Sequence, residues 1–256
     1  SAKGRIMPRE SLGRLPRSLV PTSFPGETVA SYAARIDAAT ASAVHHLWTV
    51  AVSAYREREN LPGKKRVSGK VGEREVLALI RNLVGSPADE LALLGRPSRT
   101  VWHACLLCTS GAIVVIHPAH ARLVCPVHQT WTGPMVVQSR RLRLWAVTQP
   151  DPAHSQPVDG RIAEAAARIE TSGAPAPVKE EVFKRAAAAA REEWDGKPLP
   201  GDLPTAAAII ETAMDSNVIR AVCDPFTPYS AEYDVVSRGM EEHANPLGDK
   251  GTDQAW

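Results

Sequence analysis

Aromatic residues and long apolar runs are scarce in this sequence of 256 residues. Phe, Trp and Tyr make up 5% of the chain, although hydrophobic residues make up 44%. Alanine dominates the hydrophobic residues, which favours helices over a β-sandwich. No apolar run approaches the ~20 residues of a transmembrane helix, and the first residues have no apolar segment typical of a signal peptide. We therefore expect a chain without membrane contact.

Carboxylates are absent from residues 91–150. A zinc deaminase needs a His-x-Glu motif and a zinc protease needs His-Glu-x-x-His, and neither occurs. The sequence also has no Walker A loop, no GxGxxG, no GxSxG and no His/Asn pair typical of an HNH nuclease. The sequence does not exclude a catalytic triad assembled from distant residues. These absences predict a protein that is not an enzyme.

Cysteine is rare too, and three of the four cysteines lie in CLLCTSGAIVVIHPAHARLVCPVH, residues 105–128. This clustering argues against a disulfide framework and places the chain in a reducing cytoplasm. The order is Cys105-x2-Cys108, sixteen residues, then Cys125-x2-His128. Two ligands separated by two residues share one tight turn, and two such knuckles supply four ligands. The spacing predicts a structural Zn²⁺ site whose filled tetrahedral shell leaves no position for an activated water.

Three further histidines compete with His128 for the fourth ligand position. His103, His117 and His120 lie in or next to the same stretch. The pair in HPAH falls in the middle of the expected hairpin, away from either knuckle. We favour His128, and we interpret the other three as surface or loop residues.

Apolar periodicity and segments rich in Pro and Gly divide the rest of the chain into predicted parts. The predicted fold class is mainly α with a small zinc-ribbon-like β hairpin. The hairpin lies in a zinc finger at residues 105–128 and contains a strand at residues 112–116. Residues 1–26 are rich in Arg and Pro and predict an extended basic arm, while residues 60–72 predict a basic, Gly-rich loop. The expected parts after the finger are a Pro-rich linker at 148–159, an acidic helical domain at 160–244 and a flexible tail at 245–256. Helices are expected near residues 27–39, 42–59, 73–85, 86–95, 160–171, 178–194, 204–215 and 229–243.

Charge is divided along the chain although its net value is only +2. Residues 1–104 carry a net +7, residues 105–148 a net +4 and residues 149–256 a net −9. A basic surplus of this kind suits nucleic acid, and an acidic part suits a basic protein or the chain's own basic half. The candidate nucleic-acid contacts come from the arm, the loop and the segment after the finger: Arg14, Arg17, Lys64, Lys65, Arg66, Lys70, Arg140, Arg141 and Arg143.

Two stretches together resemble the TniQ family. LPRSLVPTSFPGETVASYAARI, residues 15–36, has a Pro-rich arm followed by Pro25, Gly26, Glu27, Ser31, Tyr32 and Arg35 in the family's order. About seventy residues later, the Cys-x2-Cys and Cys-Pro-x-His pattern resembles the family's finger. The match departs from the family in two respects, since the first knuckle is Cys-Leu-Leu-Cys and the finger contains no Trp.

The resemblance implies a TniQ-like helical domain over residues 27–147, with helix-turn-helix-like elements beside a zinc finger. TniQ and the longer TnsD-like proteins are target-selection adaptors of transposons. They recognise target DNA or a guide-RNA complex and recruit an AAA+ ATPase of the TnsC/TniB type, which engages the transposase. The implied role is a non-enzymatic DNA-binding adaptor in transposition, in the cytoplasm and associated with the nucleoid. The alternatives are a transcription regulator or DNA-binding scaffold with the same domain, and a metal-dependent nuclease. A homodimer is left open.

Overall fold

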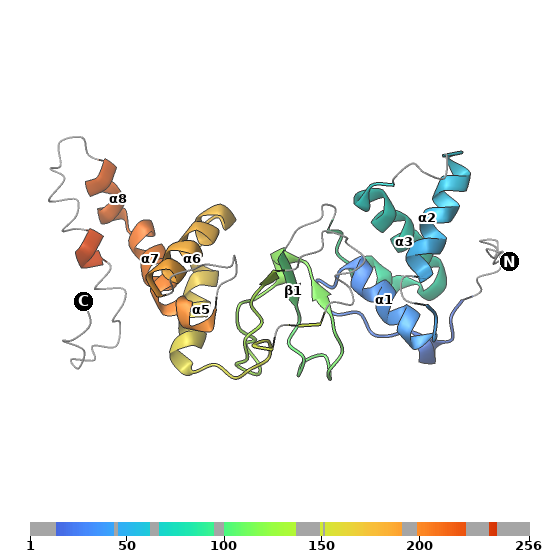
Figure 1. Ribbon diagram of the computed structural model, residues 1–256, viewed down its shortest axis with the longest axis horizontal. Helices are drawn as coiled ribbons and strands as arrows, with labels where there is room; N and C mark the ends of the chain where they lie inside the picture. The colour runs from blue at the N-terminus through green and yellow to red at the C-terminus, as the bar shows by residue number, and fades with distance from the viewer. Residues whose placement is uncertain are drawn as a thin grey trace. The chain divides into compact units, whose positions relative to one another are not determined.

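The structure is a computed structural model that describes residues 14–43, 46–61, 67–94, 100–136, 149–150, 152–190, 199–223 and 236–239. The described chain is mainly helical with one small antiparallel sheet, as predicted (Figure 1). It divides into two compact units, one of Ser1–Ala121 with Pro134–Ser155 and one of Arg122–Gly133 with Gln156–Trp256. None of the described helices combines the length and the apolar character that a membrane span needs.

Three helices form the core of the first unit. They are α1 (Val29–Ala39), α2 (His46–Arg58) and α3 (Gly69–Val84). Thr28 and Ser68 begin α1 and α3 as N-caps, because each side chain accepts a hydrogen bond from the backbone N–H three residues on, an orphan donor of the first turn. Gly85 follows α3 with a φ of 85°, which favours glycine. A short 3₁₀ helix, η3 (Ser86–Glu90), comes next and is shorter than the helix expected at 86–95.

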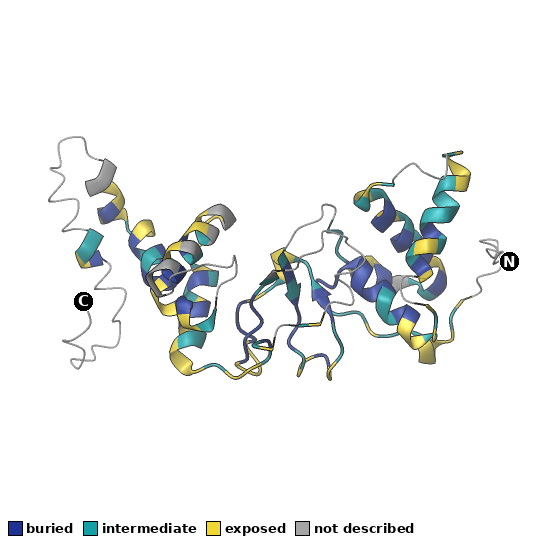
Figure 2. Cartoon of the chain, viewed as in Figure 1, coloured by how far each residue is buried: buried dark blue, intermediate teal, exposed yellow. Residues whose placement is uncertain are grey.

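The apolar faces of these helices meet in one cluster. Buried residues lie on the facing sides of α1, α2 and α3 (Figure 2). Tyr32, Ile36 and Ile80 are among the largest side chains that are almost fully buried. Burying a side chain of this size stabilises the fold by roughly 1.5–3 kcal/mol, so this cluster holds the first unit together.

The N-terminal end of α3 corrects the prediction of a loop at residues 60–72. The helix already begins at Gly69, so Lys70 belongs to its first turn. A Cβ at Gly72 would lie 2.6 Å from Cζ2 of Trp48, so this glycine makes room for the indole of α2. Close packing between two helices thus overrides the low helix propensity of glycine.

The sheet has three short strands in the order β2-β1-β3, with β1 in the middle. These are β1 (Thr100–His103), β2 (Val115–Ile116) and β3 (Met135–Val136). Antiparallel pairing aligns Trp102 with Ile116 and Val101 with Met135. The predicted strand at 112–116 is shorter in the structure, and β1 was not predicted.

The second unit contains α5 (Gly160–Thr171), α6 (Ala176–Ala190), α7 (Leu203–Met214) and α8 (Ser216–Cys223). α7 packs against α5 and α6 through small buried side chains such as Ala165, Ala186 and Ala207. Arg168 of α5 pairs with Glu211 of α7 through both carboxylate oxygens. The helices expected at 160–171, 178–194 and 204–215 are found with small shifts, whereas α8 was not predicted. Most of the helix expected at 229–243, and the tail at 245–256, lie outside the described residues.

The Pro-rich stretch predicted as a linker, 148–159, is packed where it is described. His154 is buried, and its Nε2 lies 2.9 Å from the carbonyl oxygen of Ala104 in the same unit. In the second unit, the N–H of Trp131 donates to Gln156 O and the N–H of Val158 donates to Gln129 O, both at 2.9 Å. These contacts show that residues 154–158 are ordered parts of the fold.

Candidate metal centre

The first knuckle is a tight turn that starts directly after β1. The N–H of Thr109 donates to the carbonyl of Cys105 at 3.1 Å, which closes the turn around the two cysteines. The Thr109 hydroxyl donates to the carbonyls of Leu106 and Ala112. Ser110 and Gly111 have φ values of 52° and 84°, so the chain reverses directly after the second ligand. The backbone bonds hold both cysteines on one turn, as the sequence predicted.

The second knuckle repeats this closure. The N–H of Gln129 donates to the carbonyl of Cys125, and the N–H of Cys125 donates to Thr130 O, both at 2.9 Å. Gln129 has a φ of 48° and turns the chain back. Val124 and Trp131 then form an antiparallel bridge, and the Trp131 side chain is buried. Each knuckle is therefore defined by its own backbone hydrogen bonds.

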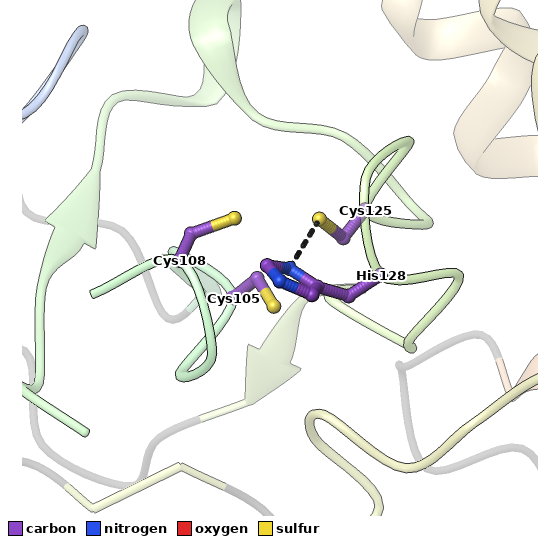
Figure 3. A group of neighbouring side chains, drawn as sticks. All are labelled: Cys105, Cys108, Cys125 and His128. Carbon is purple, nitrogen blue, oxygen red and sulfur yellow. Dashed lines mark hydrogen bonds between the residues drawn. The ribbon is translucent and has the colours of Figure 1, made fainter. Parts of the chain in front are cut away.

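The four predicted ligand atoms converge. The Sγ atoms of Cys105, Cys108 and Cys125 and a ring nitrogen of His128 all lie within 4.8 Å of one another. Figure 3 shows the four side chains pointing toward a common centre, with Cys125 Sγ 3.7 Å from His128 Nδ1. Metal–sulfur bonds of about 2.3 Å in a tetrahedron would place neighbouring donors about 3.8 Å apart. The separations and the donor set fit one tetrahedral metal ion held by three thiolates and one imidazole.

The first knuckle is supported by polar contacts from residues near position 155. The N–H of Leu106 donates to Ser155 Oγ at 3.0 Å. His103 is buried and meets the His154 ring edge-on, with ring centroids 5.6 Å apart. The prediction that His103 is a surface or loop residue is therefore wrong, because it is buried in β1 and packs against His154. The sequence pattern gave no signal for the partner, His154, which lies fifty residues away.

The histidines of HPAH lie apart from the ligand group. His117 caps the short helix η4 (Pro118–His120), with its Nδ1 accepting from the N–H of Ala119. His120 is exposed and faces His117 at 6.1 Å between ring centroids. Burial lowers the pKa of His117, and the neighbouring His120 adds to this effect. The assignment of His128 as the fourth member of the group agrees with the geometry.

One carboxylate reaches the second knuckle although the nearby sequence contains none. Glu170, in α5, accepts a hydrogen bond from the N–H of Leu123 at 2.8 Å and pairs with Arg122 at 3.0 Å. The absence of acids from residues 91–150 therefore did not predict the surroundings of the second knuckle. Both oxygens of Glu170 are engaged by these donors, which gives the side chain a structural role.

Glu27, Ser31 and Arg35, in and just before α1, form a polar network in the first unit. Glu27 is fully buried and accepts from Arg35 at 2.7 Å, from Ser31 Oγ at 3.0 Å and from the N–H of Phe24 at 3.2 Å. Arg35 also donates to the carbonyl of Thr22 at 2.9 Å. The network thus fixes the described part of the N-terminal arm against α1.

The same network contacts the strand that follows the first knuckle. Ser31 Oγ accepts from the N–H of Val115 in β2 at 3.0 Å, and the N–H of Thr28 donates to the carbonyl of Val115 at 2.9 Å. Glu27 forms an antiparallel bridge with Ile116. Gly26, with a φ of 72°, passes close to His120. These contacts join the start of α1 to the sheet beside the metal ligands.

The basic residues predicted to contact nucleic acid fall into two groups. Arg14, Arg17 and Lys70 are exposed. Leu15 packs on the helical core, and its N–H donates to the carbonyl of Leu83, so the arm lies along the end of α3. The others lie outside the described residues: Lys64, Lys65, Arg66, Arg140, Arg141 and Arg143.

Together, the fold and the site define a mainly helical protein with a Cys₃His candidate metal centre between short strands. Comparisons with protein-family models, with curated proteins and with solved structures find no match to this chain.

Proposed function

We propose that this chain is a non-enzymatic DNA-binding adaptor, similar in role to TniQ, that uses a structural zinc ion. In this role it selects target DNA and recruits an AAA+ ATPase of the TnsC/TniB type to a transposase. The adaptor would act in the cytoplasm at the nucleoid. The observation that carries the proposal is the meeting of its two family-like motifs: Ser31 and Thr28 of the first motif bond to Val115, inside the second.

The metal's proposed role follows from its donors. Three thiolates and one imidazole complete the shell that Zn²⁺ prefers in structural sites, with no position left for a reacting water. Such an ion supplies folding free energy on the order of 10 kcal/mol, a large contribution for strands of two to four residues. This supports a role for the centre in holding shape.

The helix-turn-helix character of α2 and α3 stays a prediction. The two helices pack against each other, but residues 59–68 connect them. This connection is longer than the turn of about three to four residues in a helix-turn-helix motif. We infer a related helical DNA-binding arrangement that uses the exposed side of α3.

The test of DNA binding is salt dependence. We expect the zinc-loaded chain to bind duplex DNA in an electrophoretic shift assay, with affinity falling steeply between about 50 mM and 200 mM salt. Co-purification with an AAA+ ATPase encoded beside the chain's gene tests the adaptor role. DNA binding without such an ATPase or a transposase nearby would favour the alternative of a transcription regulator. Absence of binding to any DNA would contradict the proposal.

The nuclease alternative has its own test in the same preparation. Among the residues that the structure describes, one Cys/His group is found that could hold a metal, and it has no carboxylate member. We expect supercoiled plasmid to stay intact with the chain and Mg²⁺ or Mn²⁺. Nicking that a single substitution abolishes would overturn the non-enzymatic assignment.

A further inference from the structure

The exposed side of α3 carries a line of basic side chains. At 100° per residue, Lys70, Arg74 and Arg81 fall within about 40° of one another around the helix axis. All three side chains are exposed, and the buried Val76, Ile80 and Leu83 lie away from them, whereas Leu77, on the same side as the three cations, is buried. We call Lys70, Arg74 and Arg81 the basic face.

Only one of the three side chains of the basic face forms an ion pair within the described part of the chain. Arg81 Nε donates to Asp89 at 2.7 Å, so a carboxylate lies beside this guanidinium. Across the described part of the chain, Lys70 and Arg74 form no ion pair. Glu75 of the same helix is held by Arg58 of α2 at 2.8 Å. Two cations one turn apart are thus left without a counter-charge from the described protein.

Resting on the proposed function, we infer that the basic face of α3 is a contact surface for the phosphate backbone of duplex DNA. Lys70 and Arg74 are about 6 Å apart along the helix axis. Duplex DNA carries one charge per about 1.7 Å of its axis, so one stretch of backbone meets both side chains at once. In the sequence, Lys64, Lys65 and Arg66 precede this helix and extend the same charge.

The composition of the face selects nucleic acid over a protein partner. The exposed large hydrophobic side chains of the described chain include Leu107, Val127 and Met214, and none of them belongs to α3. Stable protein interfaces have an apolar centre, usually with aromatic residues. The exposed side chains of this face are Lys70, Arg74 and Arg81, and the buried Leu77 offers no exposed apolar centre, whereas phosphate contacts need only cations.

The experiment compares the full chain with Lys70→Ala/Arg74→Ala on a short fluorescent duplex over a range of salt concentrations. The expected result is weaker binding and a slope of log affinity against log salt that is smaller by about 2 in magnitude. The control is Lys179→Ala/Arg220→Ala, which removes the same charge from the second unit and is expected to leave the slope unchanged. Circular dichroism confirms that each variant is folded, since all four side chains lie outside the buried core.

The outcomes separate the inference from the proposed function. An unchanged slope in the double variant overturns the role of α3 and leaves DNA binding in place. Failure of the wild-type chain to bind duplex overturns both. A further measurement uses poly-glutamate as a competitor of the duplex, at the same concentration of negative charges. If poly-glutamate displaces the duplex fully, and its own binding is lost in Lys70→Ala/Arg74→Ala, the face takes an acidic polypeptide and the assignment to DNA is wrong.

Discussion

Glu27 shows how one buried carboxylate can organise a junction. It receives hydrogen bonds from three donors, yet burial still raises its pKa above the ordinary value of 4.5, against the opposing effect of Arg35. The charged form therefore costs free energy in the fold, although its bonds are formed. Removing the side chain would break the ion pair with Arg35 and leave Ser31 Oγ and the N–H of Phe24 without this acceptor, a loss of about 3–5 kcal/mol.

The raised pKa of Glu27 gives a pH prediction. The folded state binds the proton of the Glu27 carboxyl more tightly than the unfolded state does. Protonated Glu27 therefore contributes fully to the free energy of unfolding below about pH 4.5, and this contribution is lost as pH rises through the folded-state pKa. Glu27→Gln cannot titrate, so we expect the free energy of unfolding of the wild type to fall relative to the variant over this interval. Urea titrations of both proteins at a series of pH values measure the difference.

Neither protein alters a metal ligand, and the two are compared at pH values at which both retain zinc. Parallel stability curves for the wild type and Glu27→Gln would contradict the prediction. The absolute stability of the variant is not the test, since the amide also changes the contact with Arg35.

At the scale of elements, the passage of the arm past η4 requires glycine at position 26. Its φ is 72°, and a Cβ there would lie 2.4 Å from Cβ of His120. We expect Gly26→Ala to lower the free energy of unfolding well beyond the ~1–2 kcal/mol of a left-handed alanine alone. The matched control is Gly111→Ala in the same unit, where φ is 84° and no atom lies within 4 Å.

Denaturant titration with saturating zinc measures both glycine variants. A similar loss in Gly26→Ala and Gly111→Ala would mean that the contact with His120 relaxes and that only the backbone conformation matters. A larger loss at position 26 would support a close junction between the arm and η4.

Local signals predicted the helices well and the sheet poorly. Apolar periodicity is a property of the helix segment itself, so α1, α5 and α7 were visible in the sequence. β1 pairs with strands more than ten residues away through two residue pairs each, and no local pattern encodes such pairing. The start of α3 was missed because Gly69 and Gly72 indicate a loop, whereas Trp48 of another helix determines the outcome.

The metal ligands were predictable because each ligand pair lies on a single turn of consecutive residues. Cys-x2-Cys and Cys-x2-His each describe one turn, and the structure brings the four side chains together as the spacing indicates. The supporting shell was not predictable, because His154, Ser155 and Glu170 come from residues far along the chain. The signature residues around Glu27 were predicted as a family mark, and their structural role emerged only from the contacts.

For the molecule as a whole, the centre implies a fixed metal content. We expect one Zn²⁺ per chain, because the four ligand atoms lie within 4.8 Å and provide one tetrahedral shell. Elemental analysis of the purified chain measures this ratio. Cys125→Ser removes one thiolate and should lose the ion and the fold of residues ~100–135. Cys223→Ser is the control, since the sequence places this cysteine outside the cluster.

A purified wild type that contains no zinc would overturn the structural role proposed for the centre. Retention of zinc by Cys125→Ser would mean that another residue completes the shell. Retention of zinc and fold by Cys223→Ser would show that the effect of Cys125→Ser does not come from the loss of any one thiol.

The backbone closure of the knuckles bears on how fast the ion comes and goes. Thr109 N–H donates to Cys105 O, and Gln129 N–H donates to Cys125 O, so each ligand pair is held on one turn of the folded chain. Once one donor of a pair has captured an ion, its neighbour is already within reach, and no chain segment has to be brought in from afar. Release must then break a whole pair together, since a single freed donor rebinds at once. The ion would accordingly exchange slowly with chelators, on the timescale of local opening and not of diffusion.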